Sequence, residues 1–507
     1  MKSRKDLLAI LVVLGSLWAT GPAVAQVNVT VTGIDATTTD PHKISGAGDF
    51  QFINHVYEGL YGHDVSGDVI PKLALSHQVS DNGTVYTFKL RPNVVFHNGE
   101  PFTSEDVRFS WARSNNPNIK NPRSPILTKN IKNVEVVDDQ TVRLILAKPD
   151  ATILANLGEN FYIVNKKTVE ELGDNRFAQA AIGTGPLKFV SRRLGQESIF
   201  EKNDGYWGDP VTYDRLIIKT VTDPQTRVAM LRAGEVDAIA NVPPQLARAL
   251  ERDSNVKVVT RPSYQNIFIV LNPQAAHGAF ADPRVRRALN MAIDRKTLID
   301  RVMFGKATES TTLCHRDIFG CNIERDPYPY DPQKAKALLV EAGFDFNRTY
   351  NVFGLAPGRV AQSKEVAEAV FFYLSQIGIK TRLELLEYGT FLGRISAKDF
   401  KSADMFWMGW TDFNNEAMGR LPRNLHSNGA LSWQNDKVLD EMIDQANAIV
   451  DPKAREVHMQ RLFTHVYDNP PAIFLWTTDE AYAMRNNIDW EPRAKVSWPE
   501  FIMLKKK

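Results

Sequence analysis

Neither sign of charge dominates the sequence. The chain has 61 lysine and arginine residues against 59 aspartate and glutamate residues. Without Lys2, Arg4, Lys5 and Asp6 near the start, the balance becomes 58 against 58. Proteins that bind nucleic acid or anionic membranes generally carry an excess of basic residues on one face. The even balance therefore argues against both classes, although a local charged pocket is compatible with it.

The sequence also lacks the motifs of common catalytic sites. It has no Gly-x-Ser-x-Gly turn for a serine nucleophile, no His-Glu-x-x-His helix for zinc, and no glycine-rich loop that ends in Gly-Lys-Ser/Thr for a nucleotide. Gly183 and Gly185 lack a third glycine and are followed by Pro186. These absences argue against a secreted hydrolase, which is the alternative from another functional class. We expect a binding protein without a cofactor.

Only two cysteines are present, Cys314 and Cys321, which are seven positions apart. In an oxidising compartment they can form a disulfide that closes a short loop. A metal site is the alternative, because His315 follows Cys314. Two cysteines and one histidine this close together lack the usual spacing of zinc ligands. We therefore predict a structural disulfide.

An apolar run long enough to direct secretion occurs at the N-terminus. Basic residues precede an apolar stretch from Leu7 to Trp18, and the small residues Ala23-Val24-Ala25 precede Gln26. This pattern predicts a signal peptide over residues 1–25. A membrane anchor is the alternative, but the run is shorter than the roughly 20 apolar residues that span a bilayer. The residue directly after the cleavage site is Gln26 and not a cysteine that could carry a lipid. We therefore expect a soluble periplasmic protein.

The length and the local patterns predict a multidomain α/β protein. A chain of 507 residues exceeds what one hydrophobic core usually supports, so two or three domains are expected. Residues 87–90 alternate polar and apolar side chains, as in a half-buried strand. Thr103 and Asp106 have the spacing of a capping box that opens a helix. Asp331 and Pro332 likewise predict the start of a helix.

Short motifs follow one another along nearly the whole chain after the signal peptide. Besides the strand-turn-helix pattern of residues 81–111, they are Tyr57-Glu58-Gly59-Leu60, Ile70-Pro71-Lys72-Leu73-Ala74, Gly183-Thr184-Gly185-Pro186, Tyr206-Trp207-Gly208, Gly234-Glu235-Val236-Asp237, Asp282-Pro283-Arg284-Val285-Arg286-Arg287-Ala288-Leu289 and Tyr330-Asp331-Pro332. Each motif alone is a weak signal. The ordered series resembles the family 5 extracellular solute-binding proteins, the peptide, opine and nickel receptors of bacterial ABC importers.

This resemblance implies a two-lobed periplasmic binding protein with a hinge, and an extra α/β domain inserted in the first lobe. The implied first lobe comprises residues 26–57, 185–268 and 483–507, the inserted domain residues 58–184, and the second lobe residues 269–482. Chain crossings near residues 264–271 and 472–480 would form the hinge, which closes the lobes around a ligand. The implied partners are an inner-membrane permease and separate ATPase subunits, and we expect a monomer.

The resemblance also implies a ligand site at the end of the strand-like residues 404–411. In peptide-binding relatives an aspartate shortly after the matching Gly-Trp holds the α-ammonium group of the peptide, which makes Asp412 the first candidate here. An ammonium withdrawn from water needs an ionised, hydrogen-bonded partner. This sequence departs from the pattern, because one residue separates Trp410 from Asp412 where peptide receptors commonly have two. The alternative interpretation makes Asp412 a turn or cap residue.

Three further candidates follow from the same resemblance. Trp407 and Trp410 would face opposite sides of a strand, and the match favours Trp410 as the ring that covers a ligand, with core packing as the alternative. Arg359 is the nearest match to an arginine that binds the ligand carboxylate in dipeptide receptors, or it is simply solvated. Ser45-Gly46 resembles a loop that contacts the ligand backbone, or it is a plain turn.

The leading hypothesis is thus a receptor for a short peptide or a peptide-like compound such as an opine. Recognition would use main-chain hydrogen bonds and charges at the ligand's ends, so selectivity for side chains is expected to be loose. A nickel-chelate receptor of the same fold is the second hypothesis, because His426 follows Trp410 in the same stretch. A receptor that feeds a signalling partner is a third.

Overall fold

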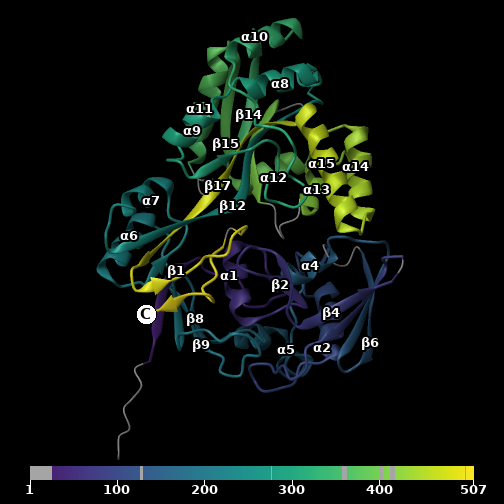
Figure 1. Cartoon of the computed structure of the whole chain (residues 1–507), viewed down its shortest axis with the longest axis vertical. Coiled ribbons are helices and arrows are strands. Elements are labelled where there is room, and N and C mark those ends of the chain that lie inside the picture. Colours follow the sequence, from purple (N-terminus) through teal and green to yellow (C-terminus); the bar gives the residue numbers. More distant parts are fainter. Residues whose placement is uncertain are drawn as a thin grey trace, which may run out of the picture.

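The computed structural model of the chain describes residues 26–80, 82–125, 130–275, 277–356, 362–398, 403–411, 417–496 and 498–507. The predicted signal peptide, residues 1–25, lies outside these described residues. Among the helices that the structure describes, none is both long enough and apolar enough to cross a membrane. The chain forms two bodies, an upper and a lower one in Figure 1, which we call the second lobe and the first lobe.

One large mixed sheet runs through both lobes. In spatial order its strands are β15 (Lys380–Leu386), β14 (Thr349–Leu355), β16 (Met405–Thr411), β12 (Val256–Leu271), β17 (Ala472–Arg485), β11 (Ala238–Ile239), β1 (Asn28–Gly33), β10 (Arg215–Thr220), β9 (Glu197–Lys202) and β8 (Leu187–Arg193). Strand β13 (Ala307–Glu309) pairs with β17 outside this order. The pairs β1–β10 and β14–β15 are parallel, as in sheets that are covered by helices. The predicted α/β class is confirmed.

The second lobe is built on one hydrophobic core that spans residues 264–476. Its helices are α8 (Pro283–Met291), α9 (Arg295–Arg301), α10 (Pro332–Glu341), α11 (Ser363–Gln376), α12 (Tyr388–Ser396), α13 (Leu421–Asn424), α14 (Lys437–Ala448) and α15 (Pro452–Asp468). Helix α10 begins where the sequence predicts, since the Asp331 carboxylate accepts a hydrogen bond of 2.8 Å from the Lys334 backbone N–H. Such caps satisfy the free N–H groups of a first helical turn.

The core of the first lobe joins segments from both ends of the chain. The helices of this lobe are α1 (Ala47–Val56) and α5 (Lys166–Ala180), together with α6 (Pro224–Ala233) and α7 (Pro244–Leu250), which pack in a smaller core of their own. The short strands β18 (Ile488–Asp489) and β19 (Lys505–Lys506) pair with each other. The Trp498 ring stacks on Phe50, with ring centroids 4.5 Å apart. The Tyr213 hydroxyl donates to the Phe501 carbonyl over 3.0 Å. The C-terminal residues therefore complete the first lobe.

A separate antiparallel sheet lies beside the first lobe and has its own core, formed by residues 60–163. Its strands, in spatial order, are β4 (Ala74–Val79), β5 (Val85–Leu90), β7 (Thr141–Leu146) and β6 (Ile131–Asp138), accompanied by the hairpin β2 (Tyr61–His63) and β3 (Val69–Pro71) and by helices α2 (Ser104–Asn115) and α4 (Ile153–Glu159). The predicted strand lies in β5, and the predicted capping box of Thr103 and Asp106 is present. Phe177 of α5 falls within the predicted inserted domain, but it packs in the core of the first lobe. The boundaries of an inserted domain at 58 and 184 remain a proposal.

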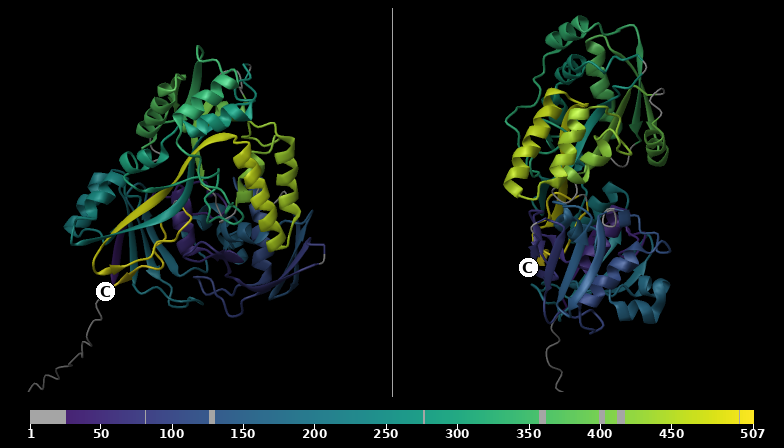
Figure 2. Two further views of the ribbon diagram at one scale, coloured as in Figure 1. Left: turned by 45° about the horizontal axis from the view of Figure 1, so that its top comes forward. Right: turned by 90° about the vertical axis from the view of Figure 1, so that its right-hand side faces the viewer.

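The long antiparallel strands β12 and β17 join the two lobes (Figures 1 and 2). Their register shifts between Pro262 and Gln265. Between these residues Tyr264 has a φ of 53°, a conformation that a bulky residue rarely adopts. The Ser263 hydroxyl bridges the same point by donating to the Thr478 carbonyl over 2.8 Å. We call this irregular part of the strand pair the hinge crossing.

Two carboxyl groups lie at the hinge crossing, and in the described part of the chain neither makes an ion pair. They belong to Asp479 and Glu480 of β17. Arg261, which is opposite Glu480 in the strand register, binds Glu491 instead. Burial raises the pKa of Asp479 to about 6. Burial, together with the neighbouring Asp479, raises the pKa of Glu480 to about 7.

We expect these two groups to make the protein less stable as the pH rises from about 5 to about 8. In the unfolded chain both groups ionise near pH 4, so their raised pKa values favour the folded state in acid, and this contribution is lost above the folded pKa values. Urea denaturation at both pH values measures the difference. Glu480→Gln should reduce it, because the amide does not titrate. If the double variant Asp479→Asn/Glu480→Gln lost as much stability between the two pH values as the wild-type protein, other groups would be responsible for the effect.

Candidate functional site

The end of strand β16 lies beside the hinge crossing, which is where the sequence predicts the ligand site. Thr411, the last residue of β16, pairs with Gln265 of β12, and Trp410 pairs with Asn266. Asp412 follows directly in the sequence. Asp412 and Arg359 both lie outside the described residues. The structure therefore positions the chain that leads to Asp412, and the roles of both residues remain proposals.

Trp410 is packed inside the second lobe next to this point. Its side chain is 8% exposed, and its ring meets Phe268 edge-on, with centroids 4.4 Å apart. Trp407 lies on the opposite face of the strand, where its indole N–H donates to the Ser363 hydroxyl of α11 over 3.0 Å. The Trp410 indole N–H is buried without a hydrogen-bond partner in the described structure. Since an unsatisfied buried donor costs free energy, this N–H is a candidate for a bond to a ligand.

Ser45 and Gly46 are exposed and form the entry to α1. Their backbone N–H groups donate to the Asp49 carboxylate over 2.8 and 3.1 Å. The Ser45 hydroxyl also donates to this carboxylate. The loop is therefore a helix cap whose donors are already used. A ligand could contact it through its acceptor oxygens or by displacing Asp49, and the predicted role of the loop remains a proposal.

Two arginines that no sequence pattern singled out, Arg123 and Arg423, lie close enough for the charge of one to act on the other. Arg123, which follows α2, donates to the Asn160 side chain over 3.3 Å, and its guanidinium carbon lies 4.7 Å from the ring centroid of Phe50 in the first lobe. Burial lowers the pKa of Arg123, the charges of Glu159 and Asp49 oppose this shift, and the positive charge of Arg423 in the second lobe has a smaller lowering effect. Like charges that approach across a boundary repel each other, so an anion between them would stabilise the approach. No recognised motif marks either residue.

His426, the residue that motivates the nickel hypothesis, is held by two carboxylates of α14. Its Nδ1 lies 3.6 Å from an Asp440 oxygen, and its Nε2 lies 3.6 Å from an Asp444 oxygen. Within the described ranges, no group of three or more histidine, cysteine, aspartate or glutamate residues is arranged to hold a metal ion. The Nδ1 of His426 also accepts a hydrogen bond of 3.0 Å from the Asn428 backbone N–H, so the contacts of His426 are local ones, and they lend the nickel hypothesis no support.

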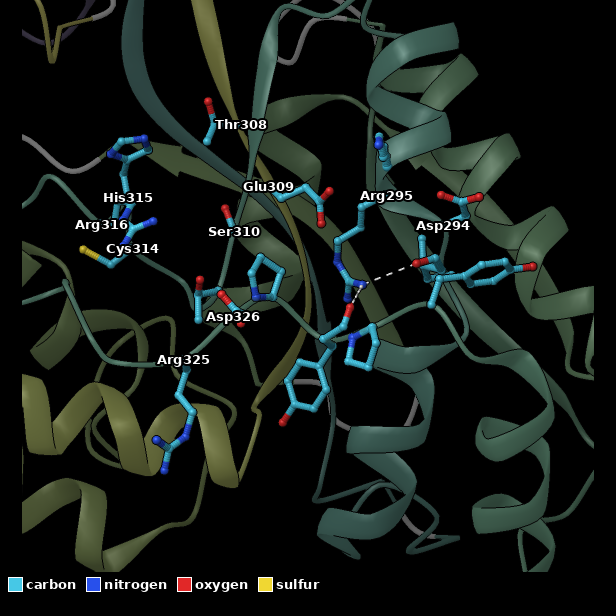
Figure 3. Close-up of a pocket in the computed structure, with 17 residues that line it drawn as sticks. Asp294, Arg295, Thr308, Glu309, Ser310, Cys314, His315, Arg316, Arg325 and Asp326 are labelled. Atoms are coloured by element: carbon cyan, nitrogen blue, oxygen red, sulfur yellow. Dashed lines mark hydrogen bonds between the residues drawn. The ribbon is translucent and has the colours of Figure 1, made fainter.

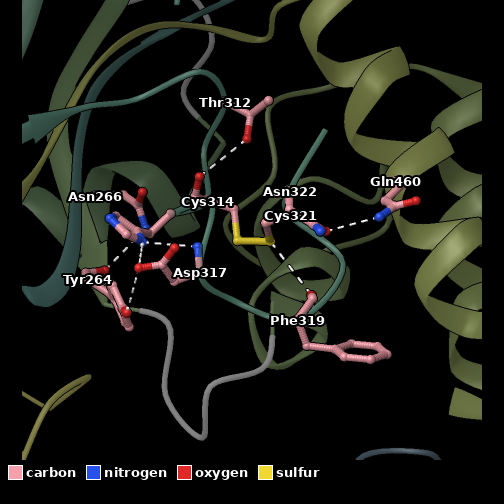
Figure 4. The surroundings of a disulfide bond; sticks show 10 residues. Tyr264, Asn266, Thr312, Cys314, Asp317, Phe319, Cys321, Asn322 and Gln460 are labelled. Atoms are coloured by element: carbon pink, nitrogen blue, oxygen red, sulfur yellow. Dashed lines mark hydrogen bonds and ion pairs between the residues drawn. A yellow bond between two sulfur atoms is a disulfide. The ribbon is translucent and has the colours of Figure 1, made fainter. Parts of the chain in front are cut away.

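The predicted disulfide between Cys314 and Cys321 is present (Figure 4). The loop that it closes is attached to the hinge crossing. The His315 ring packs on Tyr264 with centroids 4.3 Å apart, and the Tyr264 hydroxyl donates to the Asp317 carboxylate over 3.4 Å. His315, which sequence reasoning weighed as a metal ligand, thus serves as a packing residue.

Removing the disulfide should lower the free energy of unfolding by about 2 kcal/mol, because the bond closes only a short loop and restricts the unfolded chain modestly. Guanidinium denaturation of the Cys314→Ser/Cys321→Ser variant measures the loss. The wild-type protein treated with a reductant should show the same shift in its transition midpoint. Unchanged midpoints in both samples would mean that the bond contributes nothing to stability.

Three of the sequence motifs meet at one buried carboxylate. Glu58 accepts hydrogen bonds from the Tyr206 hydroxyl (2.8 Å), the Trp207 indole N–H (2.7 Å) and the Thr184 hydroxyl (3.0 Å). Burial raises the pKa of Glu58, and no cation forms an ion pair with it in the described part of the chain. The contacts join the start of the separate sheet to the first lobe. The motifs are visible in the sequence, but their meeting point is not.

Comparison with known proteins adds an independent observation. The family model described as bacterial extracellular solute-binding proteins, family 5 Middle, matches residues 68–432. The glutathione-binding protein GsiB of Pectobacterium atrosepticum is 30% identical over 405 residues, which cover 79% of this chain and 76% of that protein. The heme-binding protein A of Haemophilus influenzae is 31% identical over 444 residues, which cover 80% of this chain and 79% of that protein.

Solved structures match both lobes at once. The periplasmic binding protein DppA from Helicobacter pylori, in complex with the peptide STSA, superposes with a TM-score of 0.78 and 25% identity over 95% of this chain and 98% of that one. HbpA2 from Haemophilus parasuis gives a TM-score of 0.84 and 25% identity over 95% of this chain and 100% of that one. The two-lobed architecture of periplasmic binding proteins is therefore confirmed.

Proposed function

Because the chain belongs to family 5 of the bacterial extracellular solute-binding proteins, we propose that it captures a short peptide or peptide-like solute and delivers it to the permease of an ABC importer. One observation carries the proposal: β12 and β17 connect two separately packed lobes at an irregular crossing, beside the end of β16. Such a connection permits hinge closure around a ligand. The expected activity is binding and release without chemical conversion.

The proposed partners are an inner-membrane permease with separate ATPase subunits. The proposed location is the periplasm, with residues 1–25 as the signal peptide and the protein as a monomer. An opine belongs to the same peptide-like ligand class, because it also presents amine and carboxylate groups.

We propose that charges at the ligand's ends decide recognition. Asp412 would bind the ammonium group, and Trp410 would cover the adjoining apolar part. The ligand carboxylate would bind Arg359 or the arginines Arg123 and Arg423, which approach each other across the lobe boundary. A charge-assisted hydrogen bond in a site closed from water is stronger than a neutral one, so these end contacts outweigh the side-chain contacts.

Thermal denaturation with trialanine and with N-acetyl-trialanine tests this proposal. A ligand that binds only the folded protein raises its stability by about 2.7 kcal/mol at a hundred times its dissociation constant. We expect trialanine to raise the melting temperature and the acetylated peptide to raise it far less, because acetylation removes the ammonium group. Equal shifts with the two peptides would show that the ammonium group of the ligand does not contribute to binding. If none of a set of two- to five-residue peptides shifted the melting temperature, peptide binding would be contradicted.

A further inference from the structure

A cavity lies entirely within the second lobe. Its volume is about 420 Å³, and all of its lining residues fall between positions 293 and 330. The walls come from the start of α9, from β13 and the loop after it, from the disulfide loop, and from the segment before α10 (Figure 3). Neither the first lobe nor the end of β16 contributes a lining residue. The cavity is therefore distinct from the proposed ligand site between the lobes.

Arg295 places a buried positive charge at the wall of this cavity, where the negative charge of Glu309, another lining residue, acts on it without an ion pair. Its side chain is fully buried, and its N–H groups donate to the carbonyls of Phe474, Ile293, Tyr328 and Asn290 and to the Asn290 side chain. In the described residues no carboxylate forms an ion pair with it. Burial lowers the pKa of Arg295 to about 10, although the negative charge of Glu309 opposes this shift, and Arg295 stays protonated at neutral pH. Glu309 therefore offsets part of this buried charge, and the backbone carbonyls satisfy its N–H groups.

The remaining charged residues of the lining are close to balance but favour the positive sign. Lys296, Arg316 and Arg325 are exposed at the rim and form no ion pairs in the described part of the chain. With Arg295 they make four cations against the three carboxylates of Asp294, Glu309 and Asp326. Asp294 is occupied as the cap of α9, where it binds Thr297. Glu309 and Asp326 make no ion pair there.

A buried hydroxyl also lines this cavity without a partner. Ser310 is 5% exposed, and its Oγ has no hydrogen-bond partner in the described structure. It follows Glu309, and it precedes the disulfide loop that carries Arg316. Figure 3 shows Glu309, Ser310 and Arg316 around the same space. A buried polar group without a partner is costly, and a ligand would satisfy it.

We propose that this cavity binds a small amino-acid-sized zwitterion of net negative charge, of the glutamate type. Such a ligand carries two carboxylates and one ammonium group, which matches a lining whose exposed cations Lys296, Arg316 and Arg325 form no ion pairs in the described part of the chain and whose carboxylates Glu309 and Asp326 form none there either. Arg316 and Lys296 would bind the ligand carboxylates, since the N–H groups of Arg295 are already used. Glu309 and Asp326 would face the ammonium group of the ligand. The Ser310 hydroxyl, which has no partner in the described structure, would form a hydrogen bond with the ligand.

Isothermal titration of the full mature chain with L-glutamate tests the proposal, with L-lysine as the probe of opposite net charge. We expect saturable binding of L-glutamate and much weaker binding of L-lysine. Arg316→Ala should weaken L-glutamate binding about tenfold or more, because a hydrogen bond between charged groups is lost. Arg301→Ala is the matched control: Arg301 is an exposed arginine of the same lobe that does not line the cavity, and its replacement should change nothing.

A second variant keeps the test decisive. Ser310→Phe fills the cavity and should abolish L-glutamate binding, with circular dichroism as the check that the variant is folded. The absence of L-glutamate binding to the wild-type protein would overturn the proposal, and so would equal affinity in wild type and Arg316→Ala. Saturation with trialanine should leave L-glutamate binding intact. Competition between them would place L-glutamate in the site between the lobes and would also overturn the proposal, without affecting the proposed peptide function.

Discussion

Replacing Glu58 by alanine is expected to lower the free energy of unfolding by about 3 kcal/mol or more. The carboxylate is buried and accepts hydrogen bonds from Thr184, Tyr206 and Trp207. Its removal leaves three donors without an acceptor, and each unsatisfied buried polar group costs about 1 to 3 kcal/mol. Relief from burying a carboxylate offsets part of this loss. Chemical denaturation of the purified variant measures the difference.

A control for Glu58→Ala is Glu105→Ala. Glu105 is an exposed residue of α2 that pairs only with the exposed Arg108, so its loss should change stability by less than about 0.5 kcal/mol. Glu58→Gln should fall between the two, because the amide keeps one acceptor but turns an NH₂ group toward the remaining donors. A Glu58→Ala variant as stable as Glu105→Ala would show that the three motifs do not depend on their common carboxylate.

Replacing Asp412 by alanine is expected to weaken the binding of a free-amine peptide about 100-fold. Removing one partner of a hydrogen-bonded charge pair withdrawn from water costs about 2 to 5 kcal/mol, and 1.4 kcal/mol corresponds to a factor of ten. Titration calorimetry with trialanine, compared with the wild-type protein, measures the loss. Asp412→Asn should show a similar loss, because the amide keeps the shape of the side chain and removes its charge.

Asp300→Asn provides the matched control for Asp412. Asp300 is an exposed acidic residue of α9 in the same lobe, and its replacement should leave the affinity unchanged. The ammonium contact would be refuted if Asp412→Ala and Asp300→Asn bound trialanine equally well. A loss of affinity for both trialanine and its N-acetylated form in Asp412→Ala would instead indicate that Asp412 supports the local structure of the loop.

The sequence predicted those parts of the fold that depend on local chemistry. Asp331 caps α10, and Thr103 with Asp106 forms the capping box of α2, because these bonds involve residues only a few positions apart. The two cysteines form their disulfide for the same reason. The joining of the C-terminal Trp498 to Phe50 depends on contacts between distant segments. Periodicity has no information on such contacts, and only the family resemblance indicated the two-lobed arrangement.

The candidate site was less predictable than the fold. The alternation of a strand correctly placed Trp407 and Trp410 on opposite faces, but it could not show that Trp410 would pack on Phe268. Ser45 and Gly46 have the sequence of a loop, and their bonds to Asp49 became visible only in three dimensions. Arg123 and Arg423 lie 300 positions apart, and no local pattern links them. Their approach depends on how the two lobes face each other.

The most direct test of peptide capture is mass spectrometry of the small molecules that are released when protein purified from its native periplasm is denatured. A site closed between two lobes retains ligand during purification when dissociation is slow. The account predicts short peptides or amine-containing conjugates with a free carboxylate, at up to one molecule per chain. Release of a sugar or a lipid in that amount, with no peptide-like compound, would contradict the proposed ligand class.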